Sequence, residues 1–323
     1  MTQATARAHS NIALIKYWGK RAGPGNLPAV GSISVTLDTL YTDTRVVFDP
    51  ALAADRAQLD DAPADTTRLT PFLDLIRQRA GIDTRAAIVS HNNFPTGAGL
   101  ASSASGFAAL TLAATRAAGL DLDRRELSML ARQGSGSAAR SIFGGLVEMH
   151  RGERDDGSDA YAEPILAPED WPLDVVVAIT DTASKKINSS IGMSNLDQRS
   201  DYYDAWVAHS ESDLAGMREA IAARDFETLG ALSEMSCLKL HGLMLSTRPG
   251  LIYWNPATVA AMHAVRDLRD AGTPVYFTID AGPQVKALCP PSHSAEVARA
   301  LAAVPGVLDT RRTGLGPAAY LLP

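Results

Sequence analysis

A glycine- and serine-rich segment, residues 95–106, constrains the fold of this chain most strongly. It follows a predicted strand at 85–90 and runs into an alanine-rich, helical stretch at 102–118. Glycine permits positive φ and close backbone approach, and the amides at a helix N-terminus favour an anion. The segment therefore indicates a strand–loop–helix unit with a phosphate-binding loop, although the Gly-Lys-Ser/Thr ending of a P-loop is missing. A glycine turn with a serine N-cap is the alternative interpretation.

Composition excludes several classes of protein. Of the 323 residues, 46% are hydrophobic and 20% are charged, which is typical of a globular chain with one large or two smaller domains. The net charge of -6 argues against a nucleic-acid-binding protein. Two cysteines are too few for a disulfide framework and fit a cytoplasmic location. The sequence also contains no apolar run long enough to predict a membrane-spanning helix.

Hydrophobic periodicity predicts a mixed α+β chain without internal repeats. Polar and proline-bearing segments place a domain boundary near residue 172, which gives domains of 1–172 and 173–323. Residues 50–66 show no clean period and are expected to form a solvent-facing turn region. Strands are expected at 12–18, 33–37, 46–48, 85–90, 146–149, 173–179 and 275–279, and helices at 69–80, 102–118, 127–132, 200–223, 225–245 and 256–271.

A second anion-binding pattern lies in residues 134–141. Ser135, Ser137 and Arg140 are spaced so that two hydroxyls and a guanidinium could converge on one ligand. The planar fork of arginine suits a carboxylate or a phosphate. The alternative interpretation is a flexible turn with a solvated Arg140.

A third pattern follows the first apolar stretch of the chain. Along an extended strand, Lys16, Trp18 and Lys20 would share one face, with Tyr17 on the other. Cations and aromatic rings beside the glycine-rich loop at 22–31 could hold a polyphosphate. An edge strand whose solvated lysines block aggregation is the alternative.

Asp280 stands at the end of an apolar strand, immediately before an Ala-Gly-Pro turn. A carboxylate held rigidly and partly desolvated in this way suits a general base. The alternative is an aspartate that caps a following helix. The seven histidines show no metal-ligand spacing and the cysteines form no CxxC pair, so a resident transition-metal site is not predicted.

Taken together, the sequence resembles the diphosphomevalonate decarboxylase family of the GHMP kinase superfamily. The matching segments occur in the family's order over nearly the whole chain, and together they are specific, whereas the serine-rich loop alone indicates only the superfamily. They are residues 11–20, 32–37, 92–103, 134–145, 192–193 and 276–283.

The resemblance implies a two-domain GHMP kinase fold, with an N-terminal domain like ribosomal protein S5 domain 2 and a ferredoxin-like C-terminal domain. It implies ATP-dependent decarboxylation of mevalonate 5-diphosphate to isopentenyl diphosphate, ADP, phosphate and CO2, through phosphorylation of the 3-hydroxyl in the mevalonate pathway of isoprenoid biosynthesis. ATP and Mg²⁺ would be the cofactors, in a cytoplasmic homodimer. The alternatives are a phosphomevalonate decarboxylase, a mevalonate 3-kinase and a catalytically silent ligand-binding relative.

The resemblance also implies residue roles by position. Asp280 matches the aspartate at the substrate's 3-hydroxyl and Arg140 the arginine that holds its carboxylate, and Lys16 is placed in the catalytic group with them. The expected substrate-binding residues are Tyr17, Trp18, Lys20, Ser135, Ser137, Arg140 and Ser189. The expected nucleotide-binding residues are Asn93, Pro95, Gly97, Ala98, Gly99, Leu100, Ala101, Ser102 and Ser103, of which Ser103 would also bind the metal.

Three positions depart from the family pattern. Gln133 stands where the family often has a second arginine, and Ser190 where some bacterial members have one. Asn188 replaces a common serine. These departures concern the group that holds the substrate's anionic tail rather than the fold.

Overall fold

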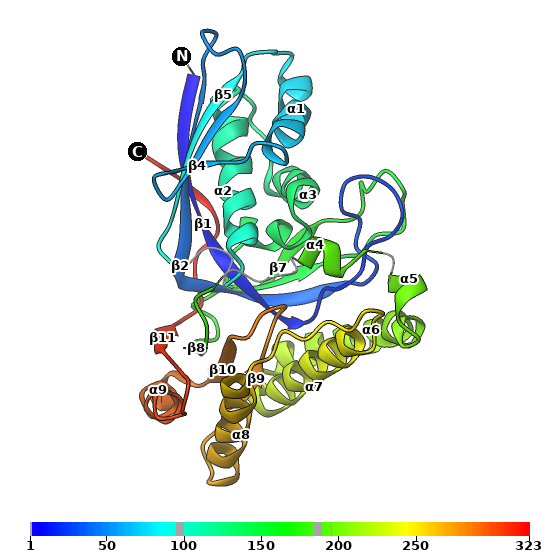
Figure 1. The fold of residues 1–323 in the computed structure, drawn as a ribbon, viewed down its shortest axis with the longest axis vertical. Coiled ribbons are helices and arrows are strands. Elements are labelled where there is room, and N and C mark those ends of the chain that lie inside the picture. Colours follow the sequence, from blue (N-terminus) through cyan, green and yellow to red (C-terminus); the bar gives the residue numbers. More distant parts are fainter. Residues whose placement is uncertain (1, 95–99, 184–188, 195) are drawn as a thin grey trace.

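The first β-sheet is built mainly from the N-terminal half of the chain (Figure 1). The computed structural model describes residues 2–94, 100–183, 189–194 and 196–323. The strands of this sheet are β1 (Thr2–Ile15), β2 (Ser32–Phe48), β3 (Arg56–Leu59), β4 (Ala62–Ala64), β5 (Ala86–Asn92), β6 (Leu146–Met149), β7 (Ala162–Leu166) and β12 (Tyr320–Leu322). The helices beside it are α1 (Leu69–Ala80), α2 (Ser102–Ala117), α3 (Arg124–Gly134) and the 3-10 helix η1 (Gly136–Ile142).

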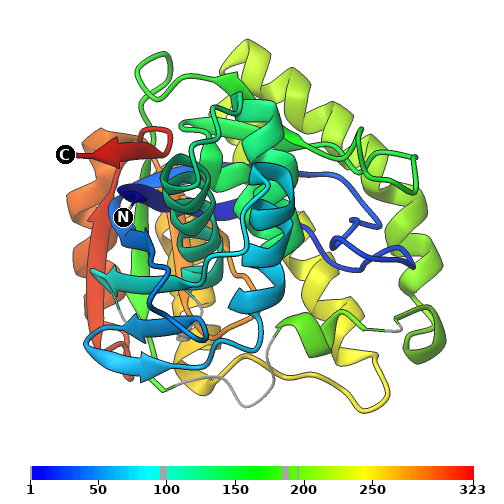
Figure 2. The same ribbon diagram turned by 90° about the horizontal axis from the view of Figure 1, so that it is seen from above.

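The long strand β2 organises this sheet. The strand order is β12-β1-β2-β5-β3-β4, and β6 with β7 extends from β2 on a separate branch. β1 pairs with β2 in antiparallel orientation, and the register shifts between His9 and Asn11 and again between Ala13 and Ile15. Helix α2 packs against β1 and β2 (Figure 2). The fully buried Ala108, with the other small side chains of α2, lets this helix lie close to the sheet.

The second sheet is antiparallel, in the order β11-β8-β10-β9. Its strands are β8 (Asp174–Ile179), β9 (Tyr276–Thr278), β10 (Val285–Cys289) and β11 (Asp309–Thr313). The remaining helices are α4 (Ser189–Gly192), α5 (Leu196–Arg199), α6 (Tyr203–Ala223), α7 (Phe226–Leu245), α8 (Pro256–Asp270), α9 (Ser294–Ala302) and the 3-10 helix η2 (Pro291–His293). In the part of the chain that the structure describes, no helix is long and apolar enough to cross a membrane.

Both faces of β8, a strand expected at 173–179, are buried. Val175 and Val177 belong to a hydrophobic cluster that includes Ile12 and Ile33 of the first sheet. Val176, on the opposite face, packs in a second cluster with residues of α8 and α9. The first of these clusters joins the two sheets, and this contact fixes the position of the second sheet relative to the end of β1.

The predicted mixed α+β class with two units is confirmed, and so are the long helices near 69–80, 102–118 and 225–245. The strand expected at 12–18 is wrong at both ends, because pairing with β2 extends β1 back to Thr2 and the strand stops at Ile15. The turn region expected at 50–66 contains β3 and β4, short strands with few β-branched residues to mark them. The boundary near residue 172 stays a prediction; β12 returns from the C-terminus to pair with β1.

Candidate active site

A cavity lies beside the point where β1 ends, between the two sheets. Its lining comes from the residues after β1, from η1, from the start of α2, from α4 and from the turn after β9. It brings together these residues predicted from the sequence: Lys16, Tyr17, Trp18, Lys20, Ala101, Ser102, Ser103, Ser135, Ser137, Arg140, Ser189 and Asp280.

Asp280 is held between two lysines. Lys16 Nζ lies 2.6 Å from Oδ1 of Asp280, and Lys286 Nζ lies 3.4 Å from Oδ2. Burial raises the pKa of Asp280, but the two ammonium groups outweigh burial and bring that pKa well below its usual value. Asp280 therefore stays ionised at neutral pH and is a weak base.

The helix-cap interpretation of Asp280 is wrong. The turn after Asp280 leads into strand β10 rather than a helix, and the Gly282 amide donates to the Asp280 carbonyl oxygen at 2.7 Å. The Asp280 side chain is 26% exposed. Part of the carboxylate thus remains accessible from the cavity while both of its oxygens are ion-paired.

Lys16 turns inward at the end of β1. The predicted strand face shared by Lys16, Trp18 and Lys20 does not form, because β1 stops at Ile15. Lys16 Nζ donates instead to the Ala13 carbonyl oxygen and to Asp280, at 2.6 Å each, and the side chain is 1% exposed. The solvated edge-strand interpretation is therefore wrong for Lys16.

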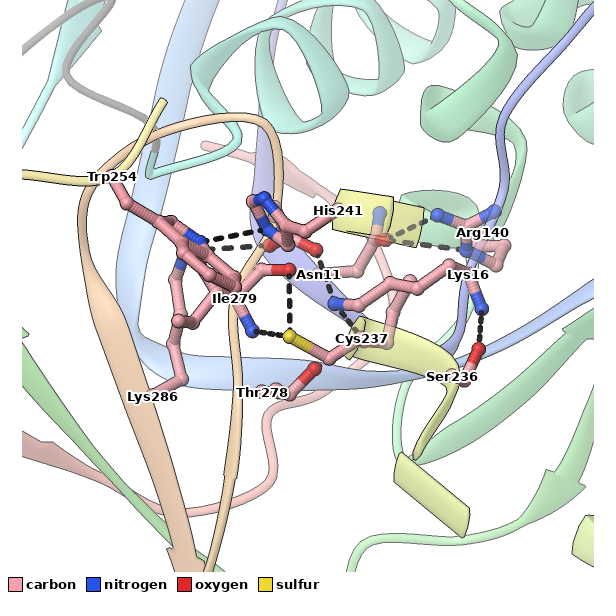
Figure 3. A network of polar contacts seen from close by, with 12 residues as sticks. Asn11, Lys16, Arg140, Ser236, Cys237, His241, Trp254, Thr278, Ile279 and Lys286 are labelled. Atoms are coloured by element: carbon pink, nitrogen blue, oxygen red, sulfur yellow. Dashed lines mark hydrogen bonds and ion pairs between the residues drawn. The ribbon is translucent and has the colours of Figure 1, made fainter. Parts of the chain in front are cut away.

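Arg140 is a buried cation oriented by neutral groups. Its Nε and Nη2 donate to Asn11 Oδ1 at 3.2 and 3.0 Å, and its Nη1 donates to Ser32 Oγ at 2.6 Å. Figure 3 shows Arg140 and Asn11 in this network of polar contacts, and both residues line the cavity. Burial lowers the pKa of Arg140 to about 10, which leaves it charged at neutral pH. Arg140 is 2% exposed, so the solvated-turn interpretation is wrong.

Two further cations line the same cavity. Lys20 Nζ donates to Asn26 Oδ1 at 2.7 Å, and Arg68 Nη2 donates to the Gly134 carbonyl oxygen at 3.3 Å. Within the described residues, neither these two side chains nor Arg140 forms a salt bridge. A charged group without a counter-ion is costly to desolvate, so the cavity is suited to an anionic ligand.

Tyr17 directs a buried hydroxyl toward the serine-bearing turn before η1. Among the described residues this hydroxyl has no hydrogen-bond partner, and burial raises the pKa of Tyr17 to about 12. The hydroxyl therefore stays protonated and can donate to a ligand. Gly136 is required beside it, because a Cβ at this position would collide with the Tyr17 hydroxyl. The hydroxyls of Ser135 and Ser137 lie 3.3 Å apart on either side of Gly136.

Trp18 and Ser189 form another part of the wall. Trp18 is 2% exposed and belongs to a hydrophobic cluster with Met193 and Ala281. A Cβ on Gly192 would lie 2.9 Å from the Trp18 ring, so the glycine allows α4 to approach the indole closely. Ser189, the first residue of α4, lines the cavity beside it.

Helix α2 begins at the cavity without a side-chain cap. Its N-cap residue is Ala101, which has a φ of 59°, an uncommon backbone conformation outside glycine. The serine N-cap interpretation is therefore wrong. Ser102 and Ser103 line both this cavity and a second one, whose walls include Ile88, Phe107 and Leu110, and Arg68 is also shared.

Two predicted nucleotide-binding residues do not line either cavity. The Asn93 side-chain amide donates to the Thr39 carbonyl oxygen at 2.7 Å and accepts from the Tyr41 amide at 2.9 Å. Leu100 is 1% exposed and packs in the cluster between the sheets. Outside the described residues lie Pro95, Gly97, Ala98 and Gly99.

Sequence reasoning missed three side chains of this region. Lys286 interrupts an apolar strand, a pattern that could have marked it as a buried, paired lysine. Arg68 and Asn11 carried no such signal, because their importance depends on the residues that tertiary folding brings beside them. Asn11 Nδ2 donates to Ser141 Oγ at 2.7 Å and to the Ser137 carbonyl oxygen at 3.0 Å, while its Oδ1 accepts from Arg140.

Family models match both halves of the chain. The diphosphomevalonate decarboxylase-like N-terminal domain matches residues 8–162, and the mevalonate 5-diphosphate decarboxylase C-terminal domain matches residues 175–313. The diphosphomevalonate decarboxylase of Eremothecium gossypii is 37% identical over 95% of this chain and 82% of its own. The phosphomevalonate decarboxylase of Haloferax volcanii is 33% identical over 99% of this chain and 98% of its own.

A solved structure, MDDEF in complex with MVAPP, AMPPCP and magnesium, is 39% identical, covers 99% of each chain and has a TM-score of 0.92. The fold and the cavity define the class of protein: a two-unit α+β enzyme whose site suits a small, multiply charged anion. The matches to both halves of the chain then identify the family. The chain belongs to the diphosphomevalonate decarboxylase family.

Proposed function

We propose that this protein catalyses the ATP-dependent decarboxylation of mevalonate 5-diphosphate to isopentenyl diphosphate, ADP, phosphate and CO2. The observation that carries the proposal is the charge distribution of the cavity. An ionised aspartate lines it together with Lys20, Arg68 and Arg140, three cations that form no salt bridge with a described carboxylate. This distribution suits a substrate with a carboxylate and a diphosphate, and relatives with this activity support it.

The substrate would be held at three points. Asp280 would accept a hydrogen bond from the 3-hydroxyl, and Arg140 would bind the carboxylate through the edge of its guanidinium. Tyr17 and Lys20 would donate to the diphosphate. The remaining polar contacts would come from Ser135, Ser137 and, near the transferred phosphoryl group, Ser189. Trp18 would close the apolar side of the site.

The nucleotide would lie across both cavities. The apolar walls of the second cavity suit the base, and the shared Arg68, Ser102 and Ser103 suit the phosphates that would continue toward Asp280. The start of α2, which no side chain caps, supports this placement. Ser103 offers a hydroxyl oxygen of the kind that Mg²⁺ accepts, and the ion, when bound, would neutralise phosphate charge. The related structure with MVAPP, AMPPCP and magnesium supports the same ligands.

The reaction follows from these positions. Asp280 orients the 3-hydroxyl, whose oxygen attacks the γ-phosphorus of ATP while ADP departs. Because both carboxylate oxygens are ion-paired, Asp280 acts first as an orienting anion and takes the hydroxyl proton only as the oxygen–phosphorus bond forms. The C3–O bond then breaks with its electron pair on phosphate. The electron pair of the bond between carbon and the carboxylate then forms the double bond of the alkene, and CO2 leaves.

A comparison of substrate esters tests this proposal. The kcat/KM for mevalonate 5-diphosphate should exceed that for the 5-phosphate by about 10²-fold or more, because two or three charge-assisted hydrogen bonds are lost with the second phosphoryl group. Equal values would contradict the diphosphate assignment. A preference for the 5-phosphate would assign the monophosphate activity of the Haloferax volcanii relative instead.

The cytoplasmic homodimer and the boundary near residue 172 remain part of the proposal. The homodimer rests on the family resemblance, and the boundary rests on the polar and proline-bearing segments before residue 172. The free cysteines Cys237 and Cys289 support the compartment. Light scattering of the purified protein tests the dimer: a mass near 34.2 kDa would contradict it.

A further inference from the structure

Lys286 lies in the middle of β10, a strand that pairs with β8 on one side and β9 on the other. Its neighbours Val285 and Ala287 point into the cluster under α8 and α9. Because side chains alternate along a strand, Lys286 points to the opposite face, toward the first sheet. The side chain is 0% exposed, and a lysine is almost never buried to this degree without a partner.

The two lysines contact different oxygens of the Asp280 carboxylate. Lys16 Nζ contacts Oδ1 and Lys286 Nζ contacts Oδ2, so the carboxylate is held from two elements of different sheets. Lys16 and Asp280 line the cavity, whereas Lys286 is not part of the described lining. Lys286 therefore lies behind Asp280 as seen from the site of the substrate.

Helix α7 supplies no charge to this cluster. Burial raises the pKa of the Cys237 thiol to about 11 and lowers the pKa of His241 to about 3. Both side chains are neutral at pH 7. Cys237 Sγ accepts from the Ile279 amide at 3.1 Å, which anchors the strand end just before Asp280 (Figure 3). The charges around the carboxylate thus come from Lys16, Lys286 and the more distant Arg140.

We propose that Lys286 is a positioning residue that fixes the Asp280 carboxylate toward the substrate's hydroxyl without touching the substrate. This inference rests on the proposed function. With Lys16 alone, the carboxylate could rotate about its Cβ–Cγ bond, because one oxygen would be released. Lys286 stops this rotation. Small displacements of a reacting group from its productive position have large effects on turnover.

Loss of Lys286 should separate turnover from both binding and folding. Lys286→Met removes a fully buried cation while Asp280 keeps Lys16, so no buried charge is left unpaired and the protein should fold. The expected kcat is lower by about tenfold or more, because a carboxylate free to rotate is less often aligned with the hydroxyl, and KM for mevalonate 5-diphosphate should stay within about twofold. The matched control is Lys239→Met, which removes a lysine paired with Asp213 at 2.8 Å on α6 and α7, and it should leave kcat unchanged.

A second arm tests the dependence on Asp280. In an Asp280→Asn background, Lys286→Met should produce no further loss of kcat, because the group that Lys286 positions is already gone. A wild-type kcat in Lys286→Met, or a full additional loss in the Asp280→Asn background, would overturn the proposal. So would a kcat loss that accompanies a lower Tm in both Lys286→Met and Lys286→Gln, since that pattern shows a structural role.

The two proposals fail in different ways. Wild-type protein that releases no CO2 from mevalonate 5-diphosphate would overturn the proposed function and this inference with it. An active wild-type enzyme with an unaffected Lys286→Met variant would overturn this inference alone.

Discussion

Lys16 and Asp280 are 264 positions apart in the chain, and their side chains meet at 2.6 Å where the two sheets face each other. Lys16 follows β1 of the first sheet, and Asp280 follows β9 of the second. The Asp280 carboxylate is therefore oriented by a group from the other unit. Any change in how the two units pack would change the geometry of this contact.

Asp280→Asn should lower kcat by about 10²-fold or more while mevalonate 5-diphosphate still binds. A carboxylate that serves as general base typically raises the reaction rate by ~10²–10⁴-fold, and the amide of the introduced asparagine cannot accept the proton. Turnover by ADP release and binding by calorimetry measure the two effects. Asp213→Asn, which removes another lysine-paired aspartate, is the control and should keep wild-type turnover. Near wild-type kcat in a folded Asp280→Asn protein would refute the role of Asp280.

Arg140→Lys should not behave as a conservative change. Lysine keeps the positive charge but loses the fork that contacts Asn11 and Ser32 and that would bind a carboxylate in two places. CO2 release should fall sharply, and ATP cleavage should fall less. Arg124→Lys serves as the control, because Arg124 donates to the carbonyl oxygen of Ile142 outside the cavity lining. Unchanged CO2 release in Arg140→Lys would contradict the carboxylate-binding role.

Lys20→Met should remove much of the preference for the diphosphate ester. Lys20 is a partly buried cation that binds only the neutral Asn26 side chain among described residues, so its charge is available to the ligand. Losing it should reduce kcat/KM for the 5-diphosphate by ~10-fold or more and affect the 5-phosphate less. The ratio of the two kcat/KM values measures the effect. A ratio equal to that of the wild type would show that Lys20 does not bind the diphosphate.

His241 should make the free energy of unfolding depend on pH. Burial and the nearby Lys16 and Lys286 lower its pKa to about 3, below the ordinary value of 6.5. Between these values the unfolded chain binds a proton that the folded chain does not, so stability falls as pH drops from about 6.5 toward 3. One such group contributes at most about 1.4 kcal/mol per pH unit.

Denaturant titrations between pH 6.5 and 4.5 test this prediction. In His241→Gln the fall of stability with decreasing pH should be shallower than in the wild type, because the variant lacks the titrating ring. His263 is exposed, so His263→Gln should keep the wild-type slope. Equal slopes in all three proteins would show that His241 is not held neutral.

The sequence predicted most of the charged side chains that line the cavity, but not how they are held. Asp280 was found from its place after an apolar strand, and Arg140 from its spacing to two serines. Lys286 was missed because a lysine in a strand acquires its role only when folding buries it against a residue on another strand. Asn11 was missed for the same reason, since its partner Arg140 comes from η1.

The first half of β1 shows a related limit. Ala6 and Ala8 are fully buried and alternate with more polar residues, so a period-two signal was present but was carried by small side chains. The strand was consequently expected only where β-branched residues begin, near residue 12. The strand ends at Ile15, and the next residue, Lys16, contacts Asp280, a partner that no local pattern in the sequence reveals.

The most direct test of the proposed reaction follows ATP cleavage and CO2 release together in one experiment. Purified protein, ATP, Mg²⁺ and mevalonate 5-diphosphate should yield ADP and CO2 in equal amounts, with isopentenyl diphosphate as the organic product. ADP formation without CO2 would show a kinase that stops after phosphorylation, and it would contradict the proposed decarboxylation.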